Sequence, residues 1–176
     1  MVVLRSLAVA AVVFTAGVAD AHVSLALTTA AAESYQVLRF GLGHGCDGKA
    51  TTALRIELPV GVTTARPQPK PGWSLRVERP AGNPEMVSAI IWTGRLAPDQ
   101  FDEFLILTRL PAAVGTLAFP AIQTCGALQN RWVEAVAPNT PRPMRPAPTL
   151  TVTPVAPASQ VGHQHNHQEL PDALRP

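Results

Sequence analysis

His22, which follows Ala19-Asp20-Ala21, is the strongest candidate in the sequence for a metal ligand. Ala19-Asp20-Ala21 carries small residues at the two positions that signal peptidase reads, and His22 follows at once. Cleavage after Ala21 would make His22 the first residue, with a free α-amino group beside its imidazole. One residue would then offer two nitrogen ligands, which suit the tetragonal preference of Cu(II). The alternative is that His22 is simply the first residue of a strand.

Residues 1–21 have the three parts of an export signal. Arg5 supplies a positive start, an apolar run covers 7–18, and the small residues of the cleavage site follow. The run is shorter than the roughly 20 apolar residues of a spanning helix, and no later run reaches that length. We therefore expect cleavage after Ala21 and a periplasmic or secreted protein with no membrane span in the mature chain. The alternative is an uncleaved anchor.

Four further residues could complete a metal site with His22. His44 lies in a glycine-rich stretch, where the backbone can approach a ligand closely, and it is equally consistent with a ligand and with an exposed loop histidine. The candidates for an oxygen ligand are Asp47, Glu57 and Glu134. An aspartate before glycine is more typical of a turn, and a glutamate on a strand more typically faces solvent.

A second group of histidines, His163, His165 and His167, lies near the C-terminus. Such tracts bind Cu(II), Ni(II) or Zn(II) weakly, so this one is a candidate auxiliary metal tract that could capture copper loosely. The alternative is a polar tail without a role in metal binding.

The chain has two cysteines, Cys46 and Cys125. An even number in an exported chain favours a disulfide, because the compartment is oxidising. The alternative is a pair of soft copper ligands.

The elements that must position these residues are predicted to be strands. Residues 54–58 and 73–78 alternate between apolar and polar side chains, the period of a half-buried strand. The other predicted strands are 22–27, 35–42, 87–92, 101–109, 116–119, 132–136 and 149–153. Glycine and proline crowd the connections, and no long amphipathic helix is indicated. Short strands at this spacing predict an all-β antiparallel sandwich or barrel.

Composition and charge bound the rest. Nine of the 18 prolines lie at or after residue 138, and the stretch from 154 onward has few large apolar residues, so we expect a folded domain over 22–153 and a disordered C-terminal tail over 154–176. The formal charge of +2 is too small to indicate a nucleic-acid partner. Common hydrolase, phosphate-loop and zinc-protease motifs are absent, and Asp102 and Glu103 would point to opposite faces of one strand.

A series of short fragments carries a family resemblance. They read GHGCDG at 43–48, ATT at 50–52, LPVGV at 58–62, PQPKPGW at 67–73, WTG at 92–94, DQFDEF at 99–104, FP at 119–120 and QTC at 123–125. In this order and spacing the chain resembles the YcnI-like family of exported copper-binding domains, over about residues 22–153.

The resemblance implies an immunoglobulin-like β-sandwich that binds Cu(II) through a mature N-terminal histidine, an arrangement called a monohistidine brace. It also implies a tryptophan close to the metal, and Trp132 in RWVE at 131–134 matches that position. A carboxylate ligand is expected but does not align securely. Many relatives have a C-terminal membrane anchor, whereas this chain ends in the histidine-bearing tail.

The sequence thus predicts a non-enzymatic periplasmic protein of copper trafficking or homeostasis. Its expected partners are the copper ion itself and a copper transporter, metallochaperone or cuproprotein. Two alternatives stand beside this prediction. One is a copper-dependent oxidative enzyme with an N-terminal histidine site, and the other is a metal-free β-sandwich interaction module.

Overall fold

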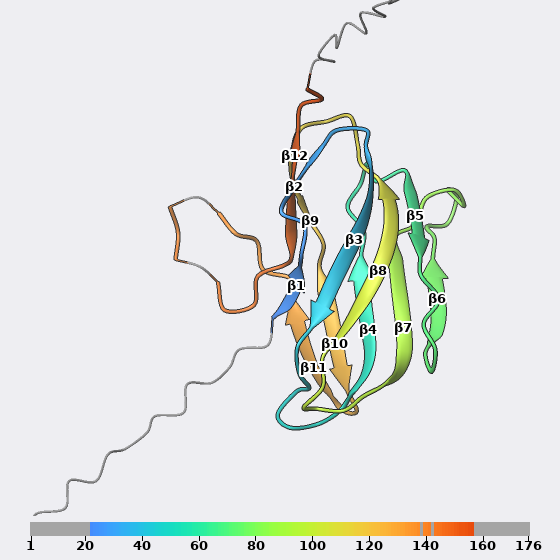
Figure 1. Cartoon of the computed structure of the whole chain (residues 1–176), viewed down its shortest axis with the longest axis vertical. Helices are drawn as coiled ribbons and strands as arrows, with labels where there is room; N and C mark the ends of the chain where they lie inside the picture. The colour runs from blue at the N-terminus through green and yellow to red at the C-terminus, as the bar shows by residue number, and fades with distance from the viewer. Residues whose placement is uncertain (1–21, 138, 142, 157–176) are drawn as a thin grey trace, which may run out of the picture.

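A computed structural model describes residues 22–137, 139–141 and 143–156 (Figure 1). Within these ranges the chain forms twelve strands, and none of it is helical. No helix in the described part of the chain could therefore cross a membrane. The predicted export signal and the histidine tract lie outside the described residues.

The strands form two main antiparallel sheets and a smaller third one. The first sheet has the order β1-β3-β8-β5, the second β11-β10-β4-β7-β6, and the third β2-β12-β9, in which β12 and β2 are parallel. The bounds are β1 Val23–Leu25, β2 Thr29–Ala31, β3 Tyr35–Leu42, β4 Thr51–Glu57, β5 Thr64–Pro67, β6 Ser74–Glu78, β7 Ala89–Leu96, β8 Asp102–Arg109, β9 Gly115–Ala118, β10 Ala121–Cys125, β11 Leu128–Trp132 and β12 Thr149–Thr153.

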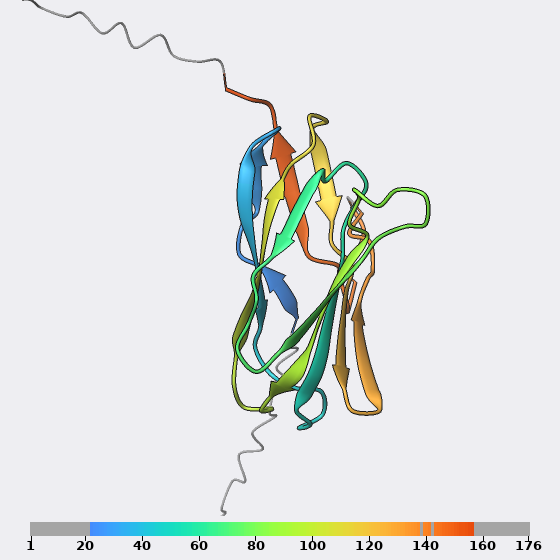
Figure 2. The same cartoon turned by 90° about the vertical axis from the view of Figure 1, so that its right-hand side faces the viewer.

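The core lies between the two larger sheets, as the two layers in Figure 2 show. Alternation builds it: in β4, Leu54 and Ile56 are fully buried, while Arg55 and Glu57 lie on the outward face and pair with each other. Phe40 of the first sheet and Trp92 of the second are also fully buried within this core. The predicted all-β sandwich is confirmed.

The prediction of a strand at 132–136 is wrong. The strand is β11, which ends at Trp132, where the prediction had it begin. Gly126 adopts a φ of 64° and turns the chain between β10 and β11, which pair from Cys125↔Leu128 to Ala121↔Trp132. The polar residues of β11 hide its alternation, because an edge strand needs few apolar side chains. The strands β2, β5 and β10 were also not predicted.

Candidate metal centre

His22 lies immediately before β1, at one end of the first sheet. Val23 is only 2% exposed and pairs with Leu42 of β3 in antiparallel register. The chain entering β1 and the chain leaving β3 therefore meet at the same end of this ladder (Figure 1). That topology places His22 and the loop carrying His44, two residues beyond Leu42, at one end of the β1–β3 ladder.

Trp132 approaches His22 from the second sheet. It is the last residue of β11, is 2% exposed, and its indole centroid lies 5.0 Å from the His22 ring centroid, with the planes tilted by 40°. Its indole Nε1–H is buried and has no hydrogen-bond acceptor in the described part of the chain. The tryptophan that the family resemblance placed near the N-terminal histidine thus contacts it across the two sheets.

The His44 side chain has a defined tautomer. Its Nδ1 lies 2.7 Å from the carbonyl oxygen of Gly45. A carbonyl only accepts, so Nδ1 carries the proton and donates it, which leaves the lone pair of the neutral ring on Nε2. Histidines that bind metals commonly donate their second ring N–H to a backbone carbonyl in this way. With that tautomer, Nε2 is the ring atom through which His44 could bind a metal.

The loop around His44 is tightly built. Cys46 and Cys125 form a disulfide between the loop and β10, which confirms the predicted bridge. Cys46 and Lys49 exchange two backbone hydrogen bonds around a tight turn, and the Gly45 N–H donates to the Pro98 carbonyl. These contacts hold the backbone next to His44 in one conformation.

One residue of this region escaped the sequence reasoning. Gln123 of β10 is fully buried, and its Nε2 donates to the His44 carbonyl oxygen and to Thr51 Oγ1, each at 2.8 Å. The only sign of this residue in the sequence is that an amide side chain stands among mostly apolar neighbours. That signal indicates a buried polar residue but does not say which loop it contacts.

The candidate carboxylates have other arrangements. Asp47 is exposed in the turn, where it and Gly48 both have positive φ, the pattern of a tight Asp-Gly turn. Glu57 lies on the outward face of β4 and pairs with Arg55 at 3.2 Å.

Glu134 lies two residues beyond Trp132 and is exposed. Its carboxylate accepts the Arg145 backbone N–H at 2.7 Å, and its backbone bonds both Arg145 and Ala147. Glu134 therefore closes the base of the loop over 133–148, seen as the large orange loop in Figure 1. Its carboxylate supports this loop.

A cavity of about 500 Å³ opens between that loop and β1. His22 and Val23 line it from the strand side, and Val136, Thr140 and Pro146 line it from the loop side. The imidazole is thus half-buried rather than fully covered, so an ion or a small solute can reach it from solvent.

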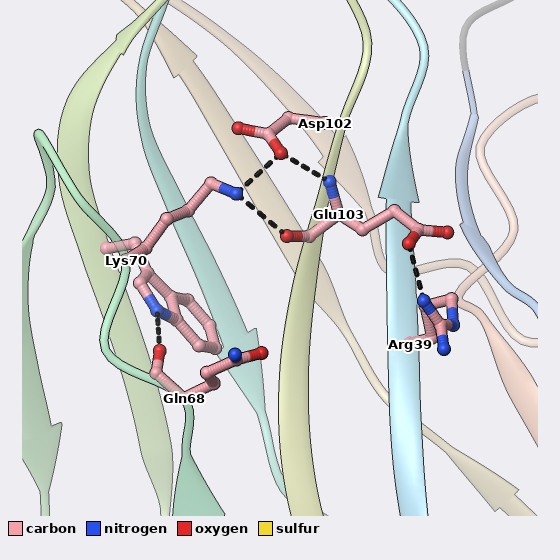
Figure 3. Close-up of polar contacts among 6 residues, drawn as sticks. Arg39, Gln68, Lys70, Asp102 and Glu103 are labelled. Atoms are coloured by element: carbon pink, nitrogen blue, oxygen red, sulfur yellow. Dashed lines mark hydrogen bonds and ion pairs between the residues drawn. The ribbon is translucent and has the colours of Figure 1, made fainter.

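A separate hollow of about 320 Å³ lies over β8, where polar residues pair with each other (Figure 3). Lys70 donates to Asp102, while Glu103 accepts from Arg39 on the other side of β8. The expectation that the adjacent acids point to opposite faces is confirmed, so they do not form a carboxylate pair.

The residues near His22 could hold a copper ion mainly through a single residue. In the described chain, no three side chains of histidine, cysteine, aspartate or glutamate are grouped so that they could hold a metal. His22 with a free amine would supply two nitrogens without a cluster of side chains, and Nε2 of His44, on the loop after β3, could add a third. An indole beside the imidazole limits the access of water.

The chain is similar to known proteins of the same fold class. A family model described as a domain of unknown function (DUF1775) matches residues 22–152. An uncharacterised protein from Nocardia farcinica, whose crystal structure reveals an immunoglobulin-like fold, is 35% identical with a TM-score of 0.66, over 74% of this chain and 97% of that one. The predicted immunoglobulin-like class is thereby confirmed.

More distant or curated relatives add little. The seventh ScaB type I cohesin from Pseudobacteroides cellulosolvens is 8% identical with a TM-score of 0.46, over 81% of this chain and 97% of that one. No curated protein matches the chain.

Proposed function

The chain belongs to the DUF1775 family, the family that the sequence resembled under the name YcnI-like, and from this premise we propose an exported Cu(II)-binding protein of copper trafficking. The ion is its cargo, taken by the α-amine and imidazole of a mature N-terminal His22. The observation that carries the proposal is the packing of the His22 ring against the buried Trp132, 5.0 Å between centroids.

Two further observations support it. The family match begins at residue 22, the residue that cleavage after Ala21 would expose. His44 has the tautomer of a metal-binding histidine, with Nδ1–H given to the Gly45 carbonyl. The second feature is expected if His44 is oriented before the ion arrives.

Each residue then has a distinct task. His22 binds the ion through two nitrogens, and His44 adds a third through Nε2. Trp132 covers one side of the His22 ring and excludes water there. Protons compete for the amine and the imidazoles, so binding weakens as pH falls. Delivery, uptake and protection from excess copper are all compatible with this binding chemistry.

The test compares two mature proteins by Cu(II) affinity and EPR. One begins at His22, and the other has one extra alanine before it, which keeps the imidazole but turns the amine into an amide. Both carry His163, His165 and His167 replaced by alanine, so that the tail contributes no copper. We expect the extended protein to lose at least tenfold in affinity and to change its EPR spectrum. Equal affinity and spectra would refute the proposal.

A further inference from the structure

Gln123 is a buried amide placed between the His44 loop and the disulfide. Its side chain is fully buried on the inward face of β10. The amide nitrogen has two protons, and the two bonds to His44 O and Thr51 Oγ1 use both. Thr51 Oγ1 in turn lies 3.8 Å from Cys125 Sγ. One side chain therefore connects the backbone of His44 to the cross-linked part of the core.

The amide is costly where it lies. Its Oε1 is buried and has no donor in the described part of the chain. A buried acceptor without a partner lowers stability, and the two hydrogen bonds of the amide nitrogen must offset that cost. A departure of this kind from local consistency is expected at functional or strained sites.

Gln123 also lies close to Trp132, the residue that packs against His22. Gln123 pairs with Asn130, and Ala121 pairs with Trp132, so Gln123 and Trp132 occupy diagonal positions on one face of the β10–β11 hairpin. Trp132 carries the other buried polar atom without a partner, its Nε1–H. The His22 contact and the His44 contact thus rest on neighbouring residues of one hairpin of the second sheet.

We propose that Gln123 is a positioning residue of the metal centre, which fixes His44 for binding by holding its carbonyl oxygen. This inference rests on the proposed function. Gln123 itself touches no ion; it acts by fixing the backbone of a residue flanked by glycines on both sides. Without the bond, the His44 backbone can rotate, and the imidazole loses the orientation set by its own bond to Gly45.

The test is a double-mutant cycle on the full mature chain, with Cu(II) affinity and EPR as readouts. The variants are Gln123→Leu, His44→Ala and the pair together. We expect Gln123→Leu to weaken Cu(II) binding about tenfold, the lower end of the effect of losing a residue that orients a ligand. We expect the double variant to bind like His44→Ala alone, because Gln123 acts through His44.

Two controls keep the result specific. Gln129→Leu makes the same chemical change on the outward face of the same hairpin and should leave affinity and spectrum unchanged. Thr51→Val removes one acceptor of the Gln123 amide at nearly constant shape and should give a smaller change of the same kind, which serves if Gln123→Leu folds poorly.

The outcomes separate the two proposals. Additive effects in the cycle, or an unchanged affinity and EPR spectrum in Gln123→Leu, would overturn the role of Gln123 while the N-terminal extension still tests His22. Equal copper binding with and without the extra alanine would refute the proposed function itself.

Discussion

Gly45 gives the sharpest stability prediction, because any side chain at this position would collide with the backbone of Lys49. A Cβ built on Gly45 would lie 1.8 Å from the Lys49 carbonyl oxygen and 3.2 Å from Pro98 Cα. Ordinary contact begins near 3.4 Å, so the substitution Gly45→Ala is about 1.6 Å too close to a backbone atom. No side-chain rotation relieves such a contact, so the loop itself must move.

The cost follows from the hydrogen bonds that this movement breaks. Three lie around the clash: Gly45 N–H to the Pro98 carbonyl, and the two backbone bonds between Cys46 and Lys49. At about 1 kcal/mol each, we expect a loss of about 2–3 kcal/mol in the free energy of unfolding. For a domain of this size that lowers Tm by about 10 °C.

Urea unfolding and thermal melts of Gly45→Ala and Gly43→Ala measure this effect. Gly43 is the matched control, since a Cβ there meets nothing within 4 Å in the same loop. Gly43→Ala should stay within about 0.5 kcal/mol of the parent. Gly45→Ala should also bind Cu(II) more weakly, because His44 donates to the Gly45 carbonyl. Equal stability of the two variants would show that the loop is not held as described.

Two further predictions concern stability. Replacing Cys46 and Cys125 by alanine removes a cross-link between residues 79 apart, and the chain-entropy estimate gives a loss of about 4.5 kcal/mol in the free energy of unfolding. A dithiol should lower the urea midpoint of the parent to that of the variant, and should leave the midpoint of the variant unchanged. The hydrogen bond from Arg55 lowers the pKa of Glu78 below its usual 4.5, so this carboxylate stabilises the fold above that pH and less as pH falls through the lower pKa. Glu78→Gln should therefore flatten the decline of Tm below about pH 4.5; an unchanged acid slope would contradict this.

The sandwich could be predicted from sequence because burial alternates along most of its strands. Leu54 and Ile56 face the core between outward-facing Arg55 and Glu57, and the period-two pattern shows it directly. The pattern fails for β11, whose core contact is concentrated in its last residue, Trp132. An edge strand is specified by its partner β10 and by the turn at Gly126, and neither leaves a periodic trace in its own residues.

The candidate site was only partly predictable for a related reason. His22 and His44 are conspicuous as residue types, and the resemblance pointed to Trp132. The roles of Glu57, Glu134 and Gln123 depend on which way a side chain faces and on which loop lies opposite. Glu134 and Glu57 look alike in sequence, yet one closes a loop through the Arg145 N–H and the other pairs with Arg55.

The register of β1 and the position of the proposed cleavage site together decide whether His22 can bind a metal through two nitrogens beside Trp132. Val23 pairs with Leu42 and is buried, and this pairing fixes the position of the residue before it, His22, whose ring contacts Trp132. A slip of one residue would turn Val23 out of the core and displace the residue before it from the indole. A cut one residue earlier would leave the imidazole in place without its own amine, and a cut one residue later would remove the imidazole altogether. In the proposed function, a copper ligand with two nitrogens beside Trp132 therefore requires both this register and cleavage after Ala21.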